Sequence, residues 1–509
     1  MTKNFSLRFI SLIALSLLIG LGQVFAQSTV TGGISGTVTD PQGRVVPNAS
    51  VTVTNEGTNA SVTLTANSDG GYKATNLQPG KYTIETTVSG FAPAKADSVI
   101  VEVGQTTTVD IPLTVGGATA EVQVTGEAPV INTNDNANAQ NINQTSINEL
   151  PINGRRWSNF ALLTPSAVPD GQFGLISFRG ISGLLNNNTI DGGDNNQAFF
   201  SEERGRTRIN YSISQAAIRE FQVNTSNYSA EYGRSAGGVT NAVTKSGTNQ
   251  FHGDLFYYNR NNRNGARNPR STQTILIAGV PTLIAAKPVD LRQQWGAAVG
   301  GPIIKDRLFF FFSYDQQKRN FPGVSIPGSS SFFNTIPVSI PTNCAATGLT
   351  TGQLLGCRGV TQTQVNSTQA FLLSLTGIVP RKGDQILYLP KIDWQINSKN
   401  LFSATYNHLQ WKSPNGVQTT TTVTGGRATF GDDLVNVDTF NARLQSSLSA
   451  SLLNEARFQY SKDFERQIGN SPAPGEPSTA LGGTRAPGIF ITNGFNFGTP
   501  NFLDRASYP

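Results

Sequence analysis

The sequence predicts a mainly β protein with a signal peptide, a small β-sandwich, a polar glycine-rich domain and the first strands of an antiparallel transmembrane β-barrel. Its 509 residues include 52 glycines and only 14% charged residues. Thr, Asn, Ser and Phe are frequent, which is typical of strands and turns. In the second half, runs of about ten residues alternate apolar and polar positions, as tilted membrane strands do. The length also exceeds that of one ordinary domain.

The first residues predict export. Lys3 and Arg8 give a basic start, an apolar run covers 9–21, and the sequence after it suits cleavage between Ala26 and Gln27. The alternative is a membrane anchor, but the run is shorter than the roughly 20 residues that a spanning helix needs. We therefore expect residues 1–26 to be a signal peptide.

No later stretch predicts a transmembrane helix. Residues 275–286 come nearest, but Gly279 and Pro281 interrupt them. A membrane role must therefore come from strands, since only helices and closed barrels satisfy their backbone in lipid. The formal charge of +6 is spread thinly, so a nucleic-acid partner is not expected.

Seven barrel strands are predicted between short turns and long loops, a pattern that puts the short turns in the periplasm and the long loops outside. They cover 251–259, 294–304, 307–316, 386–396, 401–411, 437–449 and 453–462. Apolar Phe440 and Leu444 alternate with polar Asn441 and Arg443, which predicts one lipid face and one lumen face. The run 307–316 fits less well, because its four successive Phe residues would be apolar on both faces. Plugged transporters have about 22 strands, so we expect residues 251–509 to hold only the N-terminal part of a barrel.

Residues 27–116 predict a small β-sandwich. Short alternating runs at 34–38, 49–54, 61–65, 82–88 and 99–103 are separated by turn residues. The pieces GGISGTVTDPQGRVVPNASVTVTN, SDGGYKATNLQPGKYTIETTVSGF and VEVGQTTTVDIPL resemble the carboxypeptidase regulatory-like domain. This resemblance implies a transthyretin-like accessory module without peptidase activity. It leaves two roles open, a structural spacer and a weak sugar-binding module.

Residues 117–250 are polar and rich in Gly, Asn and Ser, which suits a domain inside a water-lined barrel. LPINGRRWSNFALLTP, FRGISGLLNNNTIDGGDNN and AIREFQVNTSNYSAEYGRSAGGVTNAVTKSGTNQFHG resemble the plug of TonB-dependent receptors, in the Oar-like branch. The resemblance implies an α/β plug in an outer-membrane barrel, with the sandwich in the periplasm. It also implies that a TonB-type energy-transducing protein drives ligand uptake.

A short segment before the plug resembles a TonB box. It consists of Glu121, Val122, Gln123, Val124, Thr125 and Gly126. Such a box must be an extended peptide that can add as a strand to a periplasmic partner, and alternating valines permit this. The alternatives are the last strand of the sandwich and a plain linker.

An oxygen-rich turn in the plug is a second candidate site. It contains Asp191, Asp194, Asn195 and Asn196. It lacks the spacing and terminal Glu of an EF-hand loop, so a tight turn is favoured over a metal site and no metal is expected. The resemblance implies that such turns lie at the outward apex of the plug and contact ligand.

Two further pairs of residues are singled out. Arg179 and Arg234 can pair with carboxylates on the barrel wall and latch the plug, or they can face solvent. Cys344 and Cys357 can close a small loop disulfide in an oxidising compartment, and the alternative is two free thiols.

Enzymatic activity and a bound cofactor are not expected. His252 and His408 both fall in predicted strands, and no catalytic motif accompanies them. The resemblance implies a gated outer-membrane transporter for an oligosaccharide, siderophore or peptide, in contact with membrane lipid. The sandwich favours a carbohydrate-derived ligand. An outer-membrane adhesion or signalling protein is the alternative.

Overall fold

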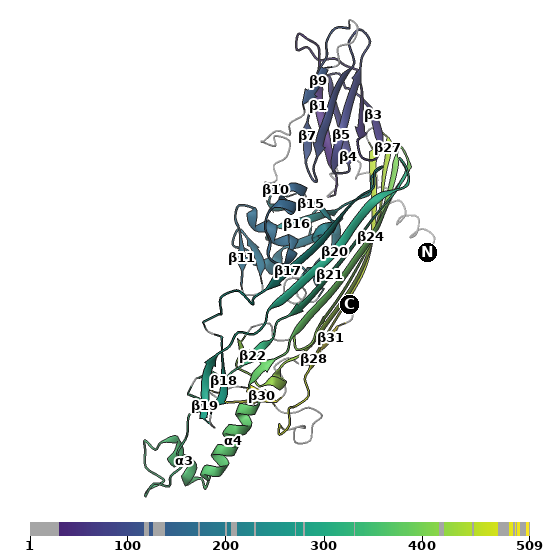
Figure 1. Ribbon diagram of the computed structural model, residues 1–509. Helices are drawn as coiled ribbons and strands as arrows, with labels where there is room; N and C mark the ends of the chain where they lie inside the picture. Colours follow the sequence, from purple (N-terminus) through teal and green to yellow (C-terminus); the bar gives the residue numbers. More distant parts are fainter. Residues whose placement is uncertain are drawn as a thin grey trace, which may run out of the picture.

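The computed structural model contains a sandwich, a central domain and a long curved barrel sheet (Figure 1). The central domain, residues 138–250, is the part that the sequence predicts to be a plug, and it is called the plug domain or the plug below. The structure describes residues 30–507 apart from 117–121, 126–137, 172–173, 199–200, 205–210, 229–230, 270, 278–279, 330, 417–421, 450–451, 477–487, 492–493, 495 and 499–504. The expected signal peptide, with Ala26 and Gln27, lies outside the described residues. So do Glu121 and Gly126 of the box.

The sandwich has two sheets that close over one apolar core. One sheet has the order β4-β1-β7 with β8 beside β1, and the other has the order β3-β2-β5-β6-β9. The strands are β1 (Gly32–Thr39), β2 (Ser50–Asn55), β3 (Ser61–Thr65), β4 (Gly71–Leu77), β5 (Gly80–Thr87), β6 (Ala94–Val101), β7 (Thr106–Thr108), β8 (Ile111–Pro112) and β9 (Val122–Thr125). Inward-facing residues alternate along each long strand, and Ile34, Val51 and Ile84 are fully buried. The five predicted runs all correspond to strands, whereas β4 was not predicted because polar residues separate its buried Tyr72, Ala74 and Leu77.

The plug domain, residues 138–250, is built on a sheet of order β10-β15-β16-β13-β14. Its strands are β10 (Asn138–Ile142), β13 (Asn187–Ile190), β14 (Gly193–Asp194), β15 (Ile218–Ser226) and β16 (Val239–Thr244), with β11 (Ala167–Asp170) and β12 (Leu175–Phe178) in a separate hairpin. Helix α2 (Gln144–Glu149) begins where the Asn143 side chain accepts a hydrogen bond from Ser146 N–H. Trp157 and Phe221 form an edge-to-face pair in the core.

The barrel sheet is antiparallel throughout, in the order β17-β20-β21-β24-β25-β27-β28-β31. Its strands are β17 (His252–Asn261), β20 (Leu291–Ile304), β21 (Leu308–Asn320), β24 (Lys382–Asn397), β25 (Asn400–Ser413), β27 (Gly431–Ser449), β28 (Leu452–Gly469) and β31 (Arg505–Ser507). All seven predicted barrel strands correspond to long strands of this sheet. Most run several residues further at the ends next to the long loops, so the hairpins rise beyond the predicted membrane-spanning core. Over the described residues the sheet is open rather than closed.

The outward face of this sheet is apolar, as the alternation predicted. Leu255 is 88% exposed, Phe458 60% and Tyr460 61%. Phe440 and Phe458 also contact each other across β27 and β28. In a soluble protein such a surface would be an interaction or aggregation site, and in a barrel it is the surface that faces lipid.

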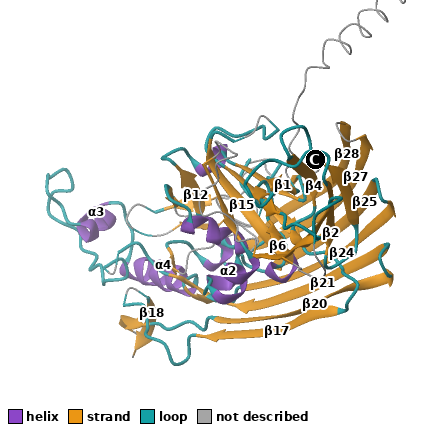
Figure 2. Cartoon of the chain, turned by 90° about the horizontal axis from the view of Figure 1, so that it is seen from above, coloured by secondary structure: helices purple, strands orange, loops and turns teal. Residues whose placement is uncertain are grey.

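The inner face is less polar than predicted, because the plug domain packs against part of it (Figure 2). Phe309 and Phe311 point inward and are 3% and 1% exposed, whereas Phe312 points outward and is 39% exposed. Phe311 and Leu389 belong to the same apolar cluster as the core of the plug domain. The run of four Phe residues is therefore apolar on both sides for two different reasons, one side for lipid and the other for the plug.

The long loops build a second apolar cluster at the end of the barrel sheet away from the sandwich. Helix α4 (Gln362–Ser374) contributes Leu372, which packs with Phe333 and Phe497. The same region holds β18 (Thr272–Ile277), β19 (Val280–Ala285), β22 (Gly323–Ser325), β23 (Gly377–Val379), β26 (Thr422–Val423), β29 (Gly488–Phe490) and β30 (Asn496–Gly498). Strands β22 and β23 come from one loop and β26 comes from the next, and the three strands pair in one small sheet. None of the described helices has the length and apolar character of a membrane span.

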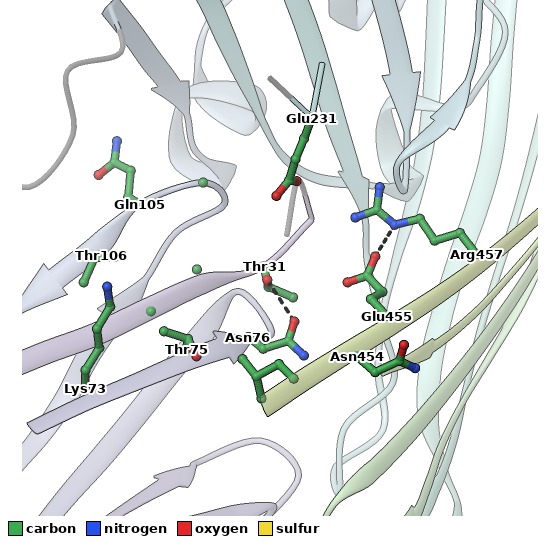
Figure 3. A pocket seen from close by; sticks show the side chains of 14 residues that line it. Thr31, Lys73, Thr75, Asn76, Gln105, Thr106, Glu231, Asn454, Glu455 and Arg457 are labelled. Atoms are coloured by element: carbon green, nitrogen blue, oxygen red, sulfur yellow. Dashed lines mark hydrogen bonds and ion pairs between the residues drawn. The ribbon is translucent and has the colours of Figure 1, made fainter. Parts of the chain in front are cut away.

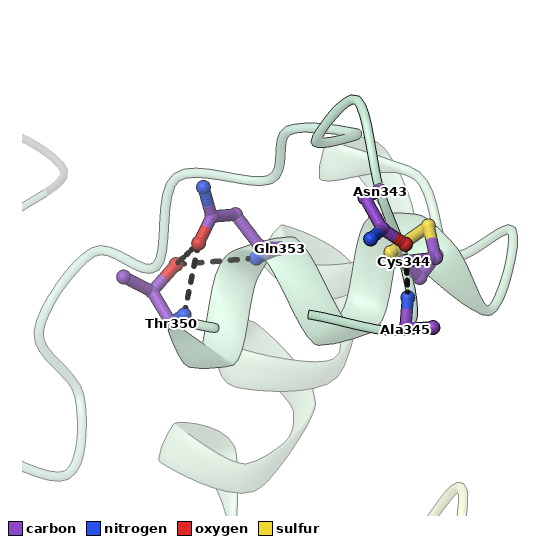
Figure 4. Close-up of a disulfide and its surroundings, with 6 residues drawn as sticks. Asn343, Cys344, Ala345, Thr350 and Gln353 are labelled. Atoms are coloured by element: carbon purple, nitrogen blue, oxygen red, sulfur yellow. Dashed lines mark hydrogen bonds between the residues drawn. A yellow bond between two sulfur atoms is a disulfide. The ribbon is translucent and has the colours of Figure 1, made fainter. Parts of the chain in front are cut away.

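Cys344 and Cys357 form a disulfide in this loop region (Figure 4). It closes a segment with a sequence separation of 13 onto helix α3 (Thr351–Cys357). The helix begins at Thr350, whose hydroxyl accepts a hydrogen bond from Gln353 N–H. The Gln353 side-chain oxygen in turn accepts a hydrogen bond from Thr350 N–H. The bridge therefore fixes the far end of a loop that a short helix alone would hold weakly.

We expect Cys344→Ser with Cys357→Ser to loosen this loop and leave the barrel sheet intact. A disulfide across a loop of this length contributes about 3 kcal/mol by restricting the unfolded chain. Limited proteolysis should therefore cut 326–376 faster in the double variant, with an unchanged heat-resistant barrel band on gels. Equal cutting rates for both proteins would show that helices α3 and α4 hold the loop without the bridge.

Candidate functional site

The plug domain is held to the barrel wall by a buried carboxylate on β21. The Tyr211 hydroxyl donates a hydrogen bond of 2.6 Å to Asp315 Oδ1, and the Ser214 hydroxyl donates one of 2.7 Å to Asp315 Oδ2. Asp315 and Tyr211 are each 1% exposed. Neighbouring strands add two amides, since Gln294 Nε2 donates to the Tyr211 hydroxyl and Gln385 Nε2 donates to the Tyr211 carbonyl. Burial, followed by the charge of Asp315, raises the pKa of Tyr211 well above its ordinary value, so the phenol stays a donor.

A second buried contact lies beneath the oxygen-rich turn. Asp191 accepts hydrogen bonds from the backbone N–H and hydroxyl of Thr244, at 2.9 and 2.6 Å. Lys391 of the barrel wall donates to the same hydroxyl at 3.0 Å. Burial acts to raise the pKa of Asp191, but the charges of Lys391 and Arg443 and the bonds from Thr244 outweigh it and lower the pKa. Asp191 is therefore an ionised link between plug and wall.

The rest of this turn also bonds to the wall or within the plug. Asp194 N–H donates to Gln459 Oε1 at 2.9 Å, in the half of β28 nearer its short turn. Asn195 and Asn196 are only 5% and 2% exposed, and the Asn196 amide bonds to Asn187. The turn thus contacts the wall in the half of β28 nearer the short barrel turn, and its place at the outward apex, which the resemblance implies, stays a prediction. The ligand contact assigned to these four residues stays a prediction without geometric support.

A third buried contact with the wall comes from a different segment of the plug domain. Arg204 Nε lies 3.2 Å from Asp463 Oδ2, with both side chains buried, in the half of β28 nearer the long loops. By contrast, the predicted latches Arg179 and Arg234 bond within the plug, to the Gly237 carbonyl and to Asp194 Oδ2 respectively. Both have a positive φ of 54°, which is the backbone conformation of a tight turn. Arg204 makes a contact with a wall carboxylate instead.

The central residues of the candidate TonB box form strand β9. It pairs in parallel with β6, with Val122 opposite Ala94 and Thr125 opposite Asp97. In the sheet order it is the last strand, so it lies at the edge of the sandwich. Two of the interpretations of this segment are therefore compatible. Residues 122–125 are extended, as a TonB box must be, and they are also the last strand of the sandwich.

The sandwich is docked on the plug through a buried glutamate. Val103 N–H donates a hydrogen bond of 2.6 Å to Glu220 Oε1 on β15. Val30, Val103 and Val243 form a small apolar cluster around this bond. Burial is the largest influence and the charge of Glu102 adds to it, so the pKa of Glu220 rises to about 7 although Arg219 opposes the shift.

The sandwich also contacts the first short turn of the barrel. Asn59 of the sandwich and Asn249 at the end of the plug both donate to Asp306 Oδ1, at 2.8 and 2.6 Å. Asn249 N–H in addition donates to the Gly57 carbonyl. The three parts of the chain therefore meet around Asp306.

A cavity of about 470 Å³ lies between the sandwich, the plug domain and strand β28 (Figure 3). Its walls include Lys73 and Asn76 of the sandwich, Glu231 of the plug, and Arg457 of β28. Charges of both signs line it, and Arg457 is ion-paired with Glu455. Across the residues that the structure describes, no three His, Cys, Asp or Glu side chains gather as a metal site would require.

Comparison with known proteins agrees with this architecture. Residues 33–114 match the carboxypeptidase regulatory-like domain family, and residues 243–352 match the outer membrane beta barrel domain family. The chain is also 29% identical over 313 residues to the TonB-dependent transporter Oar of Myxococcus xanthus. It is a homologue of a TonB-dependent transporter. The carboxypeptidase regulatory-like domain and the barrel domain expected from the sequence are thus confirmed, and the barrel domain and this relative indicate the outer membrane.

The alignment with Oar takes in 59% of this chain and 28% of that protein, so the chain spans little more than a quarter of its relative. Among solved structures, it is similar to the siderophore receptor PirA from Acinetobacter baumannii, with a TM-score of 0.42, 15% identity, and coverage of 73% of this chain and 43% of that one. It is also similar to the outer membrane transporter YddB from Escherichia coli, with a TM-score of 0.43, 12% identity, and coverage of 71% and 43%.

Sequence reasoning missed most of the residues that hold the plug. Tyr211 and Asp315 are 104 positions apart, and neither belongs to a recognisable motif. One signal was available for Asp315, because it is an acidic residue on the lumen-facing register of β21, where its nearest neighbours on the same face, Ser313 and Gln317, are also buried. A buried acid needs a partner, and hydroxyl groups of the plug supply it.

We expect Asp315→Ala to loosen the plug, because it leaves the Tyr211 and Ser214 hydroxyls buried without their acceptor. Hydrogen bonds to a charged group contribute about 1.5–3 kcal/mol each. In cells producing the protein that contains this chain, sensitivity to a large antibiotic excluded by the outer membrane should rise. Asp384→Ala, which removes an acid from the outward register of β24, is the matched control and should leave sensitivity unchanged. Equal sensitivity in the two variants would contradict the role of Asp315.

Docking of the sandwich should weaken as the pH rises. The docked pKa of Glu220 is raised to about 7 from an ordinary value of 4.5. Docking is therefore fully favoured below pH 4.5, and the advantage of about 3 kcal/mol is lost as the pH passes through 7. Glu220→Gln keeps the acceptor for Val103 N–H without the charge, so docking should become independent of pH.

Hydrogen exchange at the Val103 amide, corrected for intrinsic rates, measures this between pH 5 and 8. Protection should fall with pH in the unaltered protein and stay constant in Glu220→Gln. Glu85→Gln, on the exposed side of the sandwich, should behave like the unaltered protein. A pH slope that survives in Glu220→Gln would assign it to another group.

Proposed function

We propose that this chain is the N-terminal part of a TonB-dependent outer-membrane transporter that takes up a ligand through a plugged barrel. The main support is the way in which the plug meets the wall. Two apolar clusters cross this boundary, one that includes Phe311 and one in which Tyr211 packs against the wall. The other contacts described above are discrete hydrogen bonds and ion pairs, from Asp191, Arg204 and the Tyr211 hydroxyl. Polar contacts of this kind can be exchanged for water when the plug moves, whereas a continuous apolar core cannot.

Coupling to energy would use the edge strand of the sandwich. A periplasmic protein of the TonB type recognises an extended peptide by adding a strand to it. Strand β9 (Val122–Thr125) is extended, lies at a sheet edge and precedes the plug by a short segment. The sandwich would then lie in the periplasm, on the same side as the short barrel turn at Asp306 that it contacts.

The ligand would enter from the side of the long loops, and no catalysis is proposed. An oligosaccharide, a siderophore or a peptide would each suit a transporter of this architecture, and the sandwich favours a carbohydrate-derived ligand. Outer-membrane lipid would surround the apolar outward face of the barrel sheet.

A second function, adhesion or signalling at the cell surface, is favoured by one observation. The long loops are ordered into a common apolar cluster with helix α4, and a disulfide ties their far end. A rigid surface platform serves contact with another surface as well as it serves ligand capture.

Deleting residues 121–126 from the full-length gene tests the transport proposal. We expect energy-dependent uptake of the ligand to be lost while binding to whole cells is retained, because the box acts after binding. Deleting residues 129–134 is the control, because it shortens the same connection to the plug by the same length while keeping the box, and it should leave uptake unchanged. Normal uptake without residues 121–126 would sink the box assignment, and attachment defects without any uptake in the unaltered strain would favour adhesion.

A further inference from the structure

Three arginines stand side by side on the inner face of the barrel sheet. Arg260 on β17 lies opposite Arg292 on β20, and Arg292 lies opposite Arg319 on β21. Like charges directly opposite each other on one face destabilise a sheet. This arrangement therefore costs stability unless something compensates it.

The row faces the plug and not the lipid. Arg260 Nη1 donates a hydrogen bond of 3.1 Å to Asn153 Oδ1 of the plug. Arg292 is two residues before Gln294, which bonds to Tyr211 of the plug. All three arginines lie near the ends of their strands that lead into the long loops, so a ligand arriving from those loops would meet the row early.

The acids around the row do not balance it. Asp290 forms a two-pronged pair with Arg319, with Nε to Oδ1 at 3.1 Å and Nη2 to Oδ2 at 3.2 Å. Asp315, one step further in, is already bonded to two plug hydroxyls. The charges acting most strongly on Arg292 are those of Arg319, Asp290 and Arg260, two of them cations. Its Nε atom is buried and makes no hydrogen bond among the described residues.

Two more guanidinium groups extend the cluster. Arg381 is 1% exposed and lies over the Phe321 ring at 4.7 Å, and Arg319 lies over the same ring at 4.3 Å. From the plug, Arg155 lies over Phe256 at 3.9 Å, is 8% exposed, and has a buried Nε atom without a hydrogen-bond partner within the described part of the chain. Rings can hold cations in this way, and at Arg155 the ring contact leaves the buried Nε–H without an oxygen acceptor among the described residues.

We propose that Arg260, Arg292 and Arg319, with Arg155 facing them from the plug, form a subsite for an anionic ligand that carries carboxylate or phosphate groups. Planar guanidinium groups match such oxygen pairs in geometry as well as charge. A bound anion would remove the repulsion along the row and supply the acceptors that the buried Nε atoms lack. The inference rests on the proposed transport function and deepens it, because it names the charge class of the ligand.

The binding test uses the full protein that contains this chain, purified in detergent. Citrate and pyrophosphate are the probes for carboxylate and phosphate chemistry, and maltotriose is the uncharged reference. We expect at least one anion to bind by calorimetry and to raise the thermal unfolding midpoint, with binding that weakens as salt is added. Maltotriose should do neither at the same concentration.

Arg292→Gln should weaken anion binding at least tenfold. The affinity of Arg292→Lys should lie between those of Arg292→Gln and the unaltered protein, because lysine keeps the charge but lacks the paired N–H groups of a guanidinium. Without ligand, Arg292→Gln should unfold at the same or a higher temperature, since it removes like-charge repulsion. Lys318→Gln is the matched control, because Lys318 neighbours Arg319 on the outward register of β21 and is exposed. It should change affinity less than twofold. If Arg292→Gln does not fold, Arg260→Gln makes the same test.

The proposal is overturned if neither anion binds, if Arg292→Gln binds as tightly as the unaltered protein, or if Lys318→Gln weakens binding equally. Anion binding that depends on Arg292 in a protein that shows no energy-dependent uptake would leave this subsite standing and reject the transport proposal. Uptake of an uncharged ligand without any anion binding would reject this subsite and leave the transport proposal standing.

Discussion

Every barrel strand of this chain has to satisfy two environments at once, lipid on one side and the plug or water on the other. The backbone bonds of such strands are all used between neighbours, because nothing in lipid could replace them. Only the side chains can therefore respond to the two environments, and they do so with a period of two. This constraint explains why the inner positions hold an unusual mixture. Where the plug packs closely they are Phe311 and Leu389, and where it is held by charge they are Asp315 and Lys391.

The plug domain consequently has two distinct parts, a core of its own and a set of contacts with the wall. Its strands β15 and β16 carry almost continuous buried residues, whereas its contacts with the barrel come mainly from turns and loops, such as Asp191, Arg204 and Tyr211. Secondary structure gives the plug its own core, and irregular segments give it an attachment. The attachment can then change without unfolding of the core, which is what separates a gate from a permanent domain interface.

The sequence allowed the architecture to be predicted because that architecture repeats. Alternation over ten or more residues marked each long strand, and turn residues marked the short connections. The attachment points could not be predicted in the same way. Each depends on one residue of the plug and one of the wall, such as Arg204 and Asp463 at a separation of 259 positions, and no local pattern links them. Charge predicts Arg179 and Arg234 as latches, but in the structure they bond to the Gly237 carbonyl and to Asp194 within the plug domain.

The pairing of β9 with β6 has a mechanical consequence. The two strands run in parallel, in a register of four residue pairs at a sheet edge. A pull along the strand would load all of the connecting hydrogen bonds together and resist until they shear at once, whereas a pull away from the edge would open them one after another at lower force. The direction in which a partner takes hold of this segment would therefore decide whether the sandwich yields first or passes the force on to the plug.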